Sequence, residues 1–253
     1  MFKIALDAGH GLHTPGKRCS CVYDKNETRE WFLNNRICDK VEEKLKKYSG
    51  YLLLRVDDTT GACDVPLDER VRKANDFKAD IYLSVHHNAG LKNGKGGGII
   101  SIVYSFASAR SLECQKIIYD ELIAKTGLVG NRTAPMPKQN LYVLRETTMP
   151  AVLVECGFMD SASDVPVILS DDFAEKAAEG LVAALVEIGS LEEKRVETFK
   201  DIKGHWAEKE INELCEMGVI RGRTEDTFAP DEPVTRAEVA VLIKRAIDFV
   251  RGE

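Results

Sequence analysis

The 253-residue sequence predicts an α/β fold: a twisted, mostly parallel sheet with helices on both faces, followed by a small all-α module at the C-terminus. Short apolar runs alternate with segments in which apolar side chains recur at helical spacing. This alternation is typical of parallel sheets built from strand–helix–strand units. A polar stretch near residue 190 ends the alternation, and helical segments alone follow it.

Each element of the first region has its own pattern. Apolar runs predict strands at residues 2–6, 51–56, 81–85 and 99–104, and further strands near 141–144 and 151–155. Helical spacing predicts helices over 33–48, 67–77, 107–124 and 173–188. In the first of these helices, Leu33, Ile37, Val41 and Leu45 recur every four residues and mark one buried face.

The polar residues 190–197 lack a sheet pattern, so we expect a linker there between a domain at 1–189 and a module at 198–253. In the module, helices are expected over 207–217 and 236–250, with the turn-rich residues 223–231 between them. The length of the chain suits one large core and one small one.

Composition and charge argue against several classes of protein. Apolar residues make up 44% and charged residues 30%, which is ordinary for a globular protein. The net charge is -6, and neither region is basic, so nucleic-acid binding is not expected. No stretch reaches the roughly 18 uninterrupted apolar residues of a membrane span.

The cysteines and the N-terminus bear on the compartment. Seven cysteines without a Cys-x-x-Cys pair favour reduced thiols over disulfides or a structural zinc site. Met1 leads directly into a strand-like run, so we expect a protein made in the cytoplasm without a signal peptide.

Four separated polar residues occupy positions that should meet in space. His10 follows the first strand, while His86 and Glu155 end later apolar runs, and Glu30 lies near the start of the first helix. The carboxyl ends of parallel strands share one edge of a sheet, so these side chains should converge. Two imidazoles and a carboxylate can hold a catalytic zinc. We therefore predict one Zn²⁺ per chain on His10, Glu30 and His86, with Glu155 as the general base for hydrolysis of an amide.

Spacing alone leaves alternatives open. His13 or His87 could replace its neighbour as a ligand, and a histidine after a strand is more often a structural or surface group. Asp7 and Asn88 could orient ligands or serve in turns. The apolar residues before Glu155 predict a buried carboxylate, which is rarely left without a partner or a function.

Three motifs resemble those of the zinc-dependent N-acetylmuramoyl-L-alanine amidases: Leu6-Asp7-Ala8-Gly9-His10-Gly11, Ser84-Val85-His86-His87-Asn88-Ala89 and the segment 150–158 around Glu155. The resemblance covers nearly all of residues 1–189. It implies cleavage of the amide between the lactyl group of muramic acid and the L-alanine of the stem peptide. It also implies His10, Glu30 and His86 as zinc ligands, Glu155 as the catalytic carboxylate, and supporting roles near the ligands or substrate for Asp7, Asn88 and Arg145.

Three positions qualify this resemblance. Glu30 is preferred to Glu27 as a ligand because Asn34 follows four residues later, where the family has an asparagine. His87 stands where the family usually has a small residue, which leaves the choice between positions 86 and 87 open. Asp160 replaces a common asparagine, and we expect this to affect loop geometry more than chemistry.

The second region resembles a single S-layer homology module over residues 198 to about 247. The resemblance implies binding to a secondary cell-wall polymer, and the candidate residues are Trp206, Thr235, Arg236 and Glu238. The guanidinium of Arg236 suits an anionic polymer. Thr235 and Glu238 also fit a helix capping box, and Trp206 could be a packing anchor. Because residues 191–253 carry 15 acidic and 11 basic side chains, binding should depend on a defined pocket rather than bulk charge.

Members of that family usually carry three such modules packed together, and one module cannot bury the shared surface. We therefore expect a homodimer or homotrimer formed through the module. The whole chain is predicted to be a peptidoglycan hydrolase of the phage or prophage endolysin type, which reaches the wall after holin-type release. The alternatives are a zinc peptidase or carboxypeptidase acting on stem peptides, and a non-catalytic cell-wall-binding or S-layer interaction protein.

Overall fold

The computed structural model describes residues 1–91, 93–194 and 199–251. The chain divides into two compact units, Met1–Glu192 and Glu193–Glu253, and each is described by itself below. Part of the expected linker, residues 195–197, lies outside the described residues.

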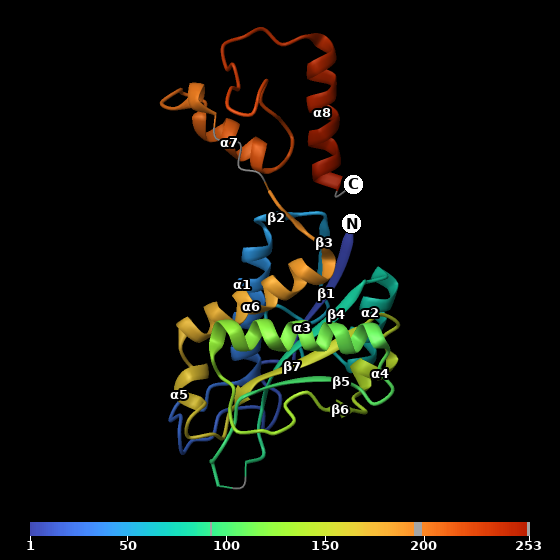
Figure 1. Ribbon diagram of the computed structural model, residues 1–253, viewed down its shortest axis with the longest axis vertical. Coiled ribbons are helices and arrows are strands. Elements are labelled where there is room, and N and C mark those ends of the chain that lie inside the picture. The colour runs from blue at the N-terminus through green and yellow to red at the C-terminus, as the bar shows by residue number, and fades with distance from the viewer. Residues whose placement is uncertain (92, 195–198, 252–253) are drawn as a thin grey trace. The chain divides into compact units, whose positions relative to one another are not determined.

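In its described part, the first unit is built on a six-stranded sheet with the order β3-β1-β4-β7-β5-β6 (Figure 1). The strands are β1 (Phe2–Ala8), β3 (Tyr51–Arg55), β4 (Ile81–Asn88), β5 (Ile99–Tyr104), β6 (Lys138–Gln139) and β7 (Ala151–Phe158). β1 runs parallel to β3 and β4, and β4 runs parallel to β7. β5 is antiparallel to β7 and parallel to β6. The carboxyl ends of β1, β4 and β7 therefore lie at one edge.

Helices cover both faces of this sheet. α1 (Glu30–Leu45), α3 (Ala109–Thr126) and α6 (Asp171–Gly189) pack on one face, with α3 and α6 side by side (Figure 1). α2 (Leu67–Phe77) and α4 (Tyr142–Glu146) pack on the other face through a separate cluster of buried residues. Ile81, Leu83 and Val85 of β4 face the first cluster, whereas Tyr82 faces the second, as the pleat of a strand requires. The predicted α/β fold with helices on both faces is confirmed.

One predicted element is wrong. The expected strand at residues 141–144 is the start of helix α4, and the neighbouring strand β6 lies earlier, at Lys138–Gln139. Val143 and Leu144 are both buried in the second cluster. Consecutive residues of a strand point to opposite faces, whereas a turn of helix directs both toward the sheet. A short apolar run does not distinguish these two cases.

Smaller elements complete the first unit. The strands β4 and β7 continue to Asn88 and Phe158, so both strands extend past His86 and Glu155, the residues predicted to end these runs. α5 (Val165–Ile168) precedes α6, and β2 (Tyr48–Ser49) forms a short separate sheet with β8 (Glu192–Glu193).

The second unit is small and helical. It contains the 3₁₀ turn η1 (Lys200–Ile202), α7 (Glu208–Glu216) and α8 (Arg236–Arg251), close to the predicted helices. Its core is formed by Phe199, Ile202, Ile211, Val219 and Ile220. Within the described residues of the chain, no helix has the length and apolar character needed to cross a membrane.

Candidate metal centre

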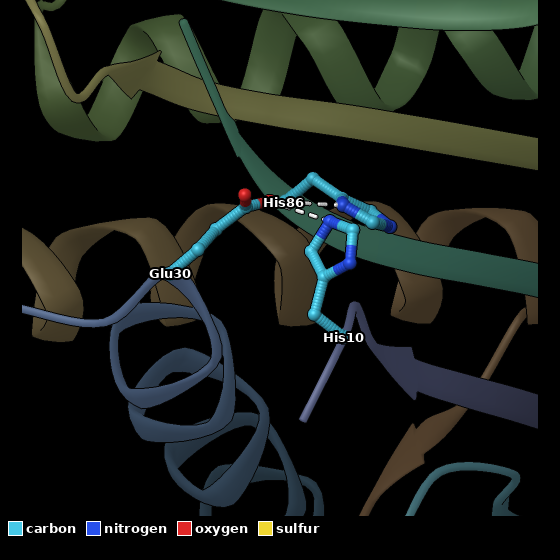
Figure 2. A group of neighbouring side chains, drawn as sticks. All are labelled: His10, Glu30 and His86. Atoms are coloured by element: carbon cyan, nitrogen blue, oxygen red, sulfur yellow. Dashed lines mark hydrogen bonds and ion pairs between the residues drawn. The ribbon is translucent and has the colours of Figure 1, made fainter. Parts of the chain in front are cut away.

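Three of the predicted side chains converge at the carboxyl edge of the sheet. Nε2 of His10 lies 3.3 Å from Oε1 of Glu30, and Nδ1 of His86 lies 3.1 Å from the same oxygen (Figure 2). The ligand atoms of the three residues all lie within 4.8 Å of one another. The group combines a loop after β1, the first turn of α1 and strand β4, which are distant in sequence.

The loop after β1 holds His10 in an uncommon conformation. His10 has a φ of 69°, in the left-handed region that non-glycine residues seldom adopt. Arg70 of α2 compensates for this by donating hydrogen bonds to the carbonyls of His10 and Ala8, at 2.9 and 2.8 Å. Gly9 is required between them, because an added Cβ would overlap the imidazole ring of His86.

Arg70 in turn belongs to a buried network with Asp7. Its guanidinium pairs with the Asp7 carboxylate, which also accepts hydrogen bonds from the hydroxyls of Tyr82 and Ser84, each at 2.7 Å. Burial raises the pKa of Asp7, but the charge of Arg70 and the hydrogen bond from Ser84 outweigh this and hold it below the usual value. Asp7 therefore supports the loop backbone through Arg70. Arg70 lies in the helix predicted over residues 67–77, but the sequence pattern did not predict this role.

The pleat of β4 gives its two adjacent histidines different environments. His86 is on the face that carries α2 and α4, while His87 points to the opposite face and is 2% exposed. Nδ1 of His87 donates to Oδ1 of Asn34 at 2.8 Å, and burial lowers the pKa of His87 to about 3, so its ring is neutral. The geometry thus places the imidazole of His86, and not that of His87, beside the Glu30 carboxylate.

Glu30 is buried at 1% exposure in the first turn of α1. Burial raises the pKa of a carboxyl, but the hydrogen bonds with His10 and His86 outweigh it and hold the pKa of Glu30 well below its usual range. One turn later, the side chain of Asn34 donates to the carbonyl of Gly9 at 3.1 Å. Glu30 and Asn34 therefore connect α1 to the same two segments, the β1 loop and β4.

The competing residues lie elsewhere. Glu27 pairs with Arg18 at 3.2 Å, with a side chain that is 40% exposed, and does not belong to the cluster. His13 is exposed and is likewise outside it.

Glu155 lies on β7, directly opposite His86 in the parallel register of the two strands. Its Oε2 is buried and has no hydrogen-bond partner among the described residues. Burial, together with the charge of the Glu30 carboxylate, outweighs the opposing charge of His86 and raises the pKa of Glu155 to about 7. A carboxyl with a pKa near neutrality can both accept and return a proton.

The remaining supporting candidates have local contacts. Oδ1 of Asn88 accepts the backbone N–H of Ala89 at 2.8 Å. Arg145 is exposed and bonds to Glu146 and Asn140, at 2.7 and 2.8 Å.

Asp160 serves the loop that follows β4. Its Oδ2 accepts the backbone N–H groups of Gly90 and Leu91, both at 2.7 Å. These contacts fit the expectation that the aspartate at this position acts on loop geometry.

A pocket of about 420 Å³ adjoins His10 and His86. Its walls include Leu67 and Tyr142, the first residues of α2 and α4, and Val65 and Leu141, which lie just before these helices. The pocket can therefore receive a group attached to a bond that reacts beside the two imidazoles.

The candidate residues of the second unit have different surroundings, and Arg236 is the first residue of α8. Thr235 and Glu238 form the predicted capping box, with the backbone N–H of each donating to the side chain of the other at 2.7 and 3.2 Å. Glu238 also pairs with Arg223 at 2.9 Å. Trp206 is 87% exposed, so the expectation that it is a packing anchor is wrong. A separate pocket of about 700 Å³ lies between α8 and the loop before it, and it includes Glu238.

Replacing Arg70 by methionine should test the buried network. The substitution leaves the Asp7 carboxylate without its cation and frees two carbonyls of the β1 loop. We expect the free energy of unfolding to fall by about 3–5 kcal/mol, the usual cost of breaking a buried ion pair. Urea denaturation followed by circular dichroism measures this. Arg72→Met is the control, because Arg72 is on the same helix but 64% exposed, and its loss should have little effect. An equal loss in both variants would contradict the role given to Arg70.

Residues 4–187 match the N-acetylmuramoyl-L-alanine amidase family, and residues 198–240 match the S-layer homology domain. The chain is 31% identical to N-acetylmuramoyl-L-alanine amidase CwlM of Bacillus licheniformis, covering 79% of this chain and 74% of that protein. It is 33% identical to the sporulation-specific N-acetylmuramoyl-L-alanine amidase of Bacillus subtilis (71% and 65%) and 32% identical to the endolysin of Bacillus phage SPP1 (76% and 67%).

Solved structures show the same architecture. The catalytic domain of CwlV from Bacillus (Paenibacillus) polymyxa superposes with a TM-score of 0.66 at 24% identity, covering 76% of this chain and all (100%) of that domain. The N-acetylmuramoyl-L-alanine amidase of Clostridium difficile 630 gives a TM-score of 0.66 at 26% identity, covering 74% and 95%. From its sequence match and its fold, this chain belongs to the N-acetylmuramoyl-L-alanine amidase family and carries a C-terminal S-layer homology domain.

Proposed function

We propose that the chain is a zinc-dependent peptidoglycan hydrolase that cleaves the amide between N-acetylmuramic acid and L-alanine. The observation that carries this proposal is the convergence of His10, Glu30 and His86 beside Glu155. The relatives named as N-acetylmuramoyl-L-alanine amidases support the choice of substrate. The endolysin relative supports a lytic role at the bacterial wall. Release through a separate membrane-permeabilising protein is a further part of this proposal.

The donor set fits a zinc ion. Two imidazole nitrogens and a carboxylate oxygen, all within 4.8 Å of one another, match a ligand combination common at catalytic zinc sites. The Glu30 carboxylate is buried and ionised, a state that requires nearby positive charge. Three ligands from the chain leave a position for water and substrate. When bound, zinc would polarise the carbonyl of the scissile amide and lower the pKa of a water molecule.

The residues of the chain account for the other parts of the reaction. The buried Oε2 of Glu155, which has no hydrogen-bond partner among the residues described, can accept a proton from the attacking water. The same carboxyl can then return this proton to the departing amine of L-alanine. Leu67 and Tyr142 line the adjoining pocket, which can receive the groups on either side of the scissile bond. Asn34 and Arg70 hold the segments that carry the ligands.

Single substitutions should separate metal binding from proton transfer. The wild-type chain should hold one zinc, and chelation should abolish lysis of purified walls until zinc is restored. Glu155→Ala should keep the zinc but lose activity by roughly 10²–10⁴-fold, the range for a general base. His86→Ala should lose both. Metal analysis and the fall in wall turbidity measure these effects, with Glu27→Ala as the carboxylate control because Glu27 lies outside the cluster. Unaltered lysis by the Glu155 variant would refute the assignment of the base.

The products distinguish an amidase from a zinc peptidase acting on stem peptides. Digestion of purified peptidoglycan should release stem peptides with a free L-alanine amine and leave free lactyl groups on the glycan, as mass spectrometry of the fragments would show. New ends within the peptide would favour the peptidase instead. Wall binding without any new ends would favour a non-catalytic wall-binding or S-layer interaction protein.

The S-layer homology domain is the proposed wall-binding part, with a secondary cell-wall polymer as its ligand. Trp206 is exposed and available to a saccharide, whereas Thr235 and Glu238 are occupied in capping α8. Arg236 begins α8 and offers a guanidinium for an anionic group.

We also propose that the module joins copies of this chain into a dimer or trimer. α8 exposes an apolar stripe on one face: Val239, Ile243, Ile247 and Val250 are 38%, 55%, 41% and 84% exposed. Their spacing of three to four residues aligns them along the helix. Pairing this stripe with the same stripe of a second copy would bury it.

Light scattering should therefore report a dimer or trimer at micromolar concentration. Ile243→Glu should shift the protein to monomer, because a charge in the stripe opposes burial. Lys209→Glu is the matched control on α7, where the side chain is 80% exposed and outside the stripe. A wild-type chain that is monomeric throughout this range would rule out the assembly.

A further inference from the structure

Lys17 is placed directly beside the buried carboxylate of the metal centre. Its Nζ lies 3.6 Å from Oε2 of Glu30, and its side chain is 43% exposed while that of Glu30 is 1% exposed. An exposed ion pair contributes little, but here one partner is removed from water. The positively charged ammonium of Lys17 therefore lies on the side of the Glu30 carboxylate that faces solvent.

The backbone holds Lys17 in this place. The N–H of Glu30 donates to the carbonyl of Lys17 at 3.1 Å, which joins residue 17 to the first turn of α1. Arg18 and Arg29 form a β-bridge, and the N–H of Cys19 donates to Thr28 at 2.8 Å. The two ends of the loop 17–30 are thus paired, so the position of Lys17 is set by the same contacts that begin α1.

The two oxygens of Glu30 have different neighbours. Oε1 lies against the imidazoles of His10 and His86 (Figure 2). The same oxygen accepts the backbone N–H of His87 at 3.3 Å. Oε2 has no hydrogen-bond partner within the described part of the chain, and Lys17 is its charged neighbour there. One oxygen is therefore directed to the ligand cluster and the other to the ammonium.

We propose that Lys17 is a positioning residue that retains Oε2 of Glu30 and so limits this carboxylate to binding zinc through one oxygen. The inference rests on the zinc site of the proposed function. A carboxylate can bind zinc through one oxygen or both, and a second oxygen would take up space that a catalytic site leaves open for water. By attracting Oε2 of Glu30, the ammonium of Lys17 keeps this oxygen away from the position that water would occupy.

Removing Lys17 should increase the affinity for zinc, whereas a substitution that only disturbs the local structure should decrease it. Without the ammonium, both oxygens of Glu30 are free to bind, and a cation that repels the metal ion is removed. Lys17→Met should therefore bind zinc more tightly, by on the order of tenfold, the scale of a close charge pair in a protein. A merely structural contribution of Lys17 would weaken metal binding.

The experiment uses the full chain loaded with Co²⁺ in place of zinc, because the visible absorption of Co²⁺ weakens as its coordination number rises. Lys17→Met is compared with Lys17→Arg, which keeps the charge, and with Lys25→Met, which removes a lysine from the same loop that bonds to the carbonyl of Cys21 instead. Zinc affinity is measured by competition with a chromophoric chelator.

We expect weaker absorption and tighter zinc binding in Lys17→Met, and wild-type values in the other two variants. An unchanged spectrum in Lys17→Met, or weaker zinc binding, overturns the proposal. The same changes in Lys25→Met overturn it as well. If the wild-type chain binds neither metal, the zinc site of the proposed function fails. Failure of the Lys17 variant alone leaves that site intact.

Discussion

A single carboxylate oxygen, Oε1 of Glu30, is the point on which the arrangement of the site depends. It contacts imidazoles carried by the β1 loop and by β4, at 3.3 and 3.1 Å, and it also accepts a backbone N–H from β4. Such a buried, ionised group is tolerated only with several compensating partners. The start of α1, the loop after β1 and the carboxyl end of β4 must therefore meet within a few ångströms, and the parallel order of β1 beside β4 makes this possible.

The pleat of β4 lets one strand serve two purposes. His86 faces the pocket while the adjacent His87 is buried against α1, where Asn34 binds it. Asn34 also donates a hydrogen bond to the carbonyl of Gly9 in the β1 loop. Asn34 therefore joins α1 to the β1 loop and to β4, as Glu30 does one helical turn earlier. The packing of α1 in the core thereby also fixes the two segments that carry His10 and His86. Arg70 acts on the same loop from the opposite face, so His10 is fixed from both sides.

Much of this could be predicted from the sequence, because the fold follows from apolar periodicity and the convergence of His10, His86 and Glu155 follows from the shared edge of parallel strands. The pattern failed at residues 141–144, where four apolar residues suit a strand or a helical turn equally well. Arg70 and Lys17 were missed for another reason. Their partners are backbone carbonyls and one oxygen of a carboxylate, contacts that no residue spacing reveals. Trp206 was misjudged because a module this small leaves large side chains outside its core.

The two faces of the sheet have separate cores of unequal extent. The larger cluster, with α1, α3 and α6, carries the packing, whereas the smaller one, with α2 and α4, also supplies the walls of the pocket. Val143 and Leu153 of the smaller cluster line the pocket together with Leu67 and Tyr142, which stand at the starts of α2 and α4. Because the residues that line the pocket are not members of the larger cluster, substitutions among them can change the shape of the pocket without altering the packing of α1, α3 and α6 against the sheet.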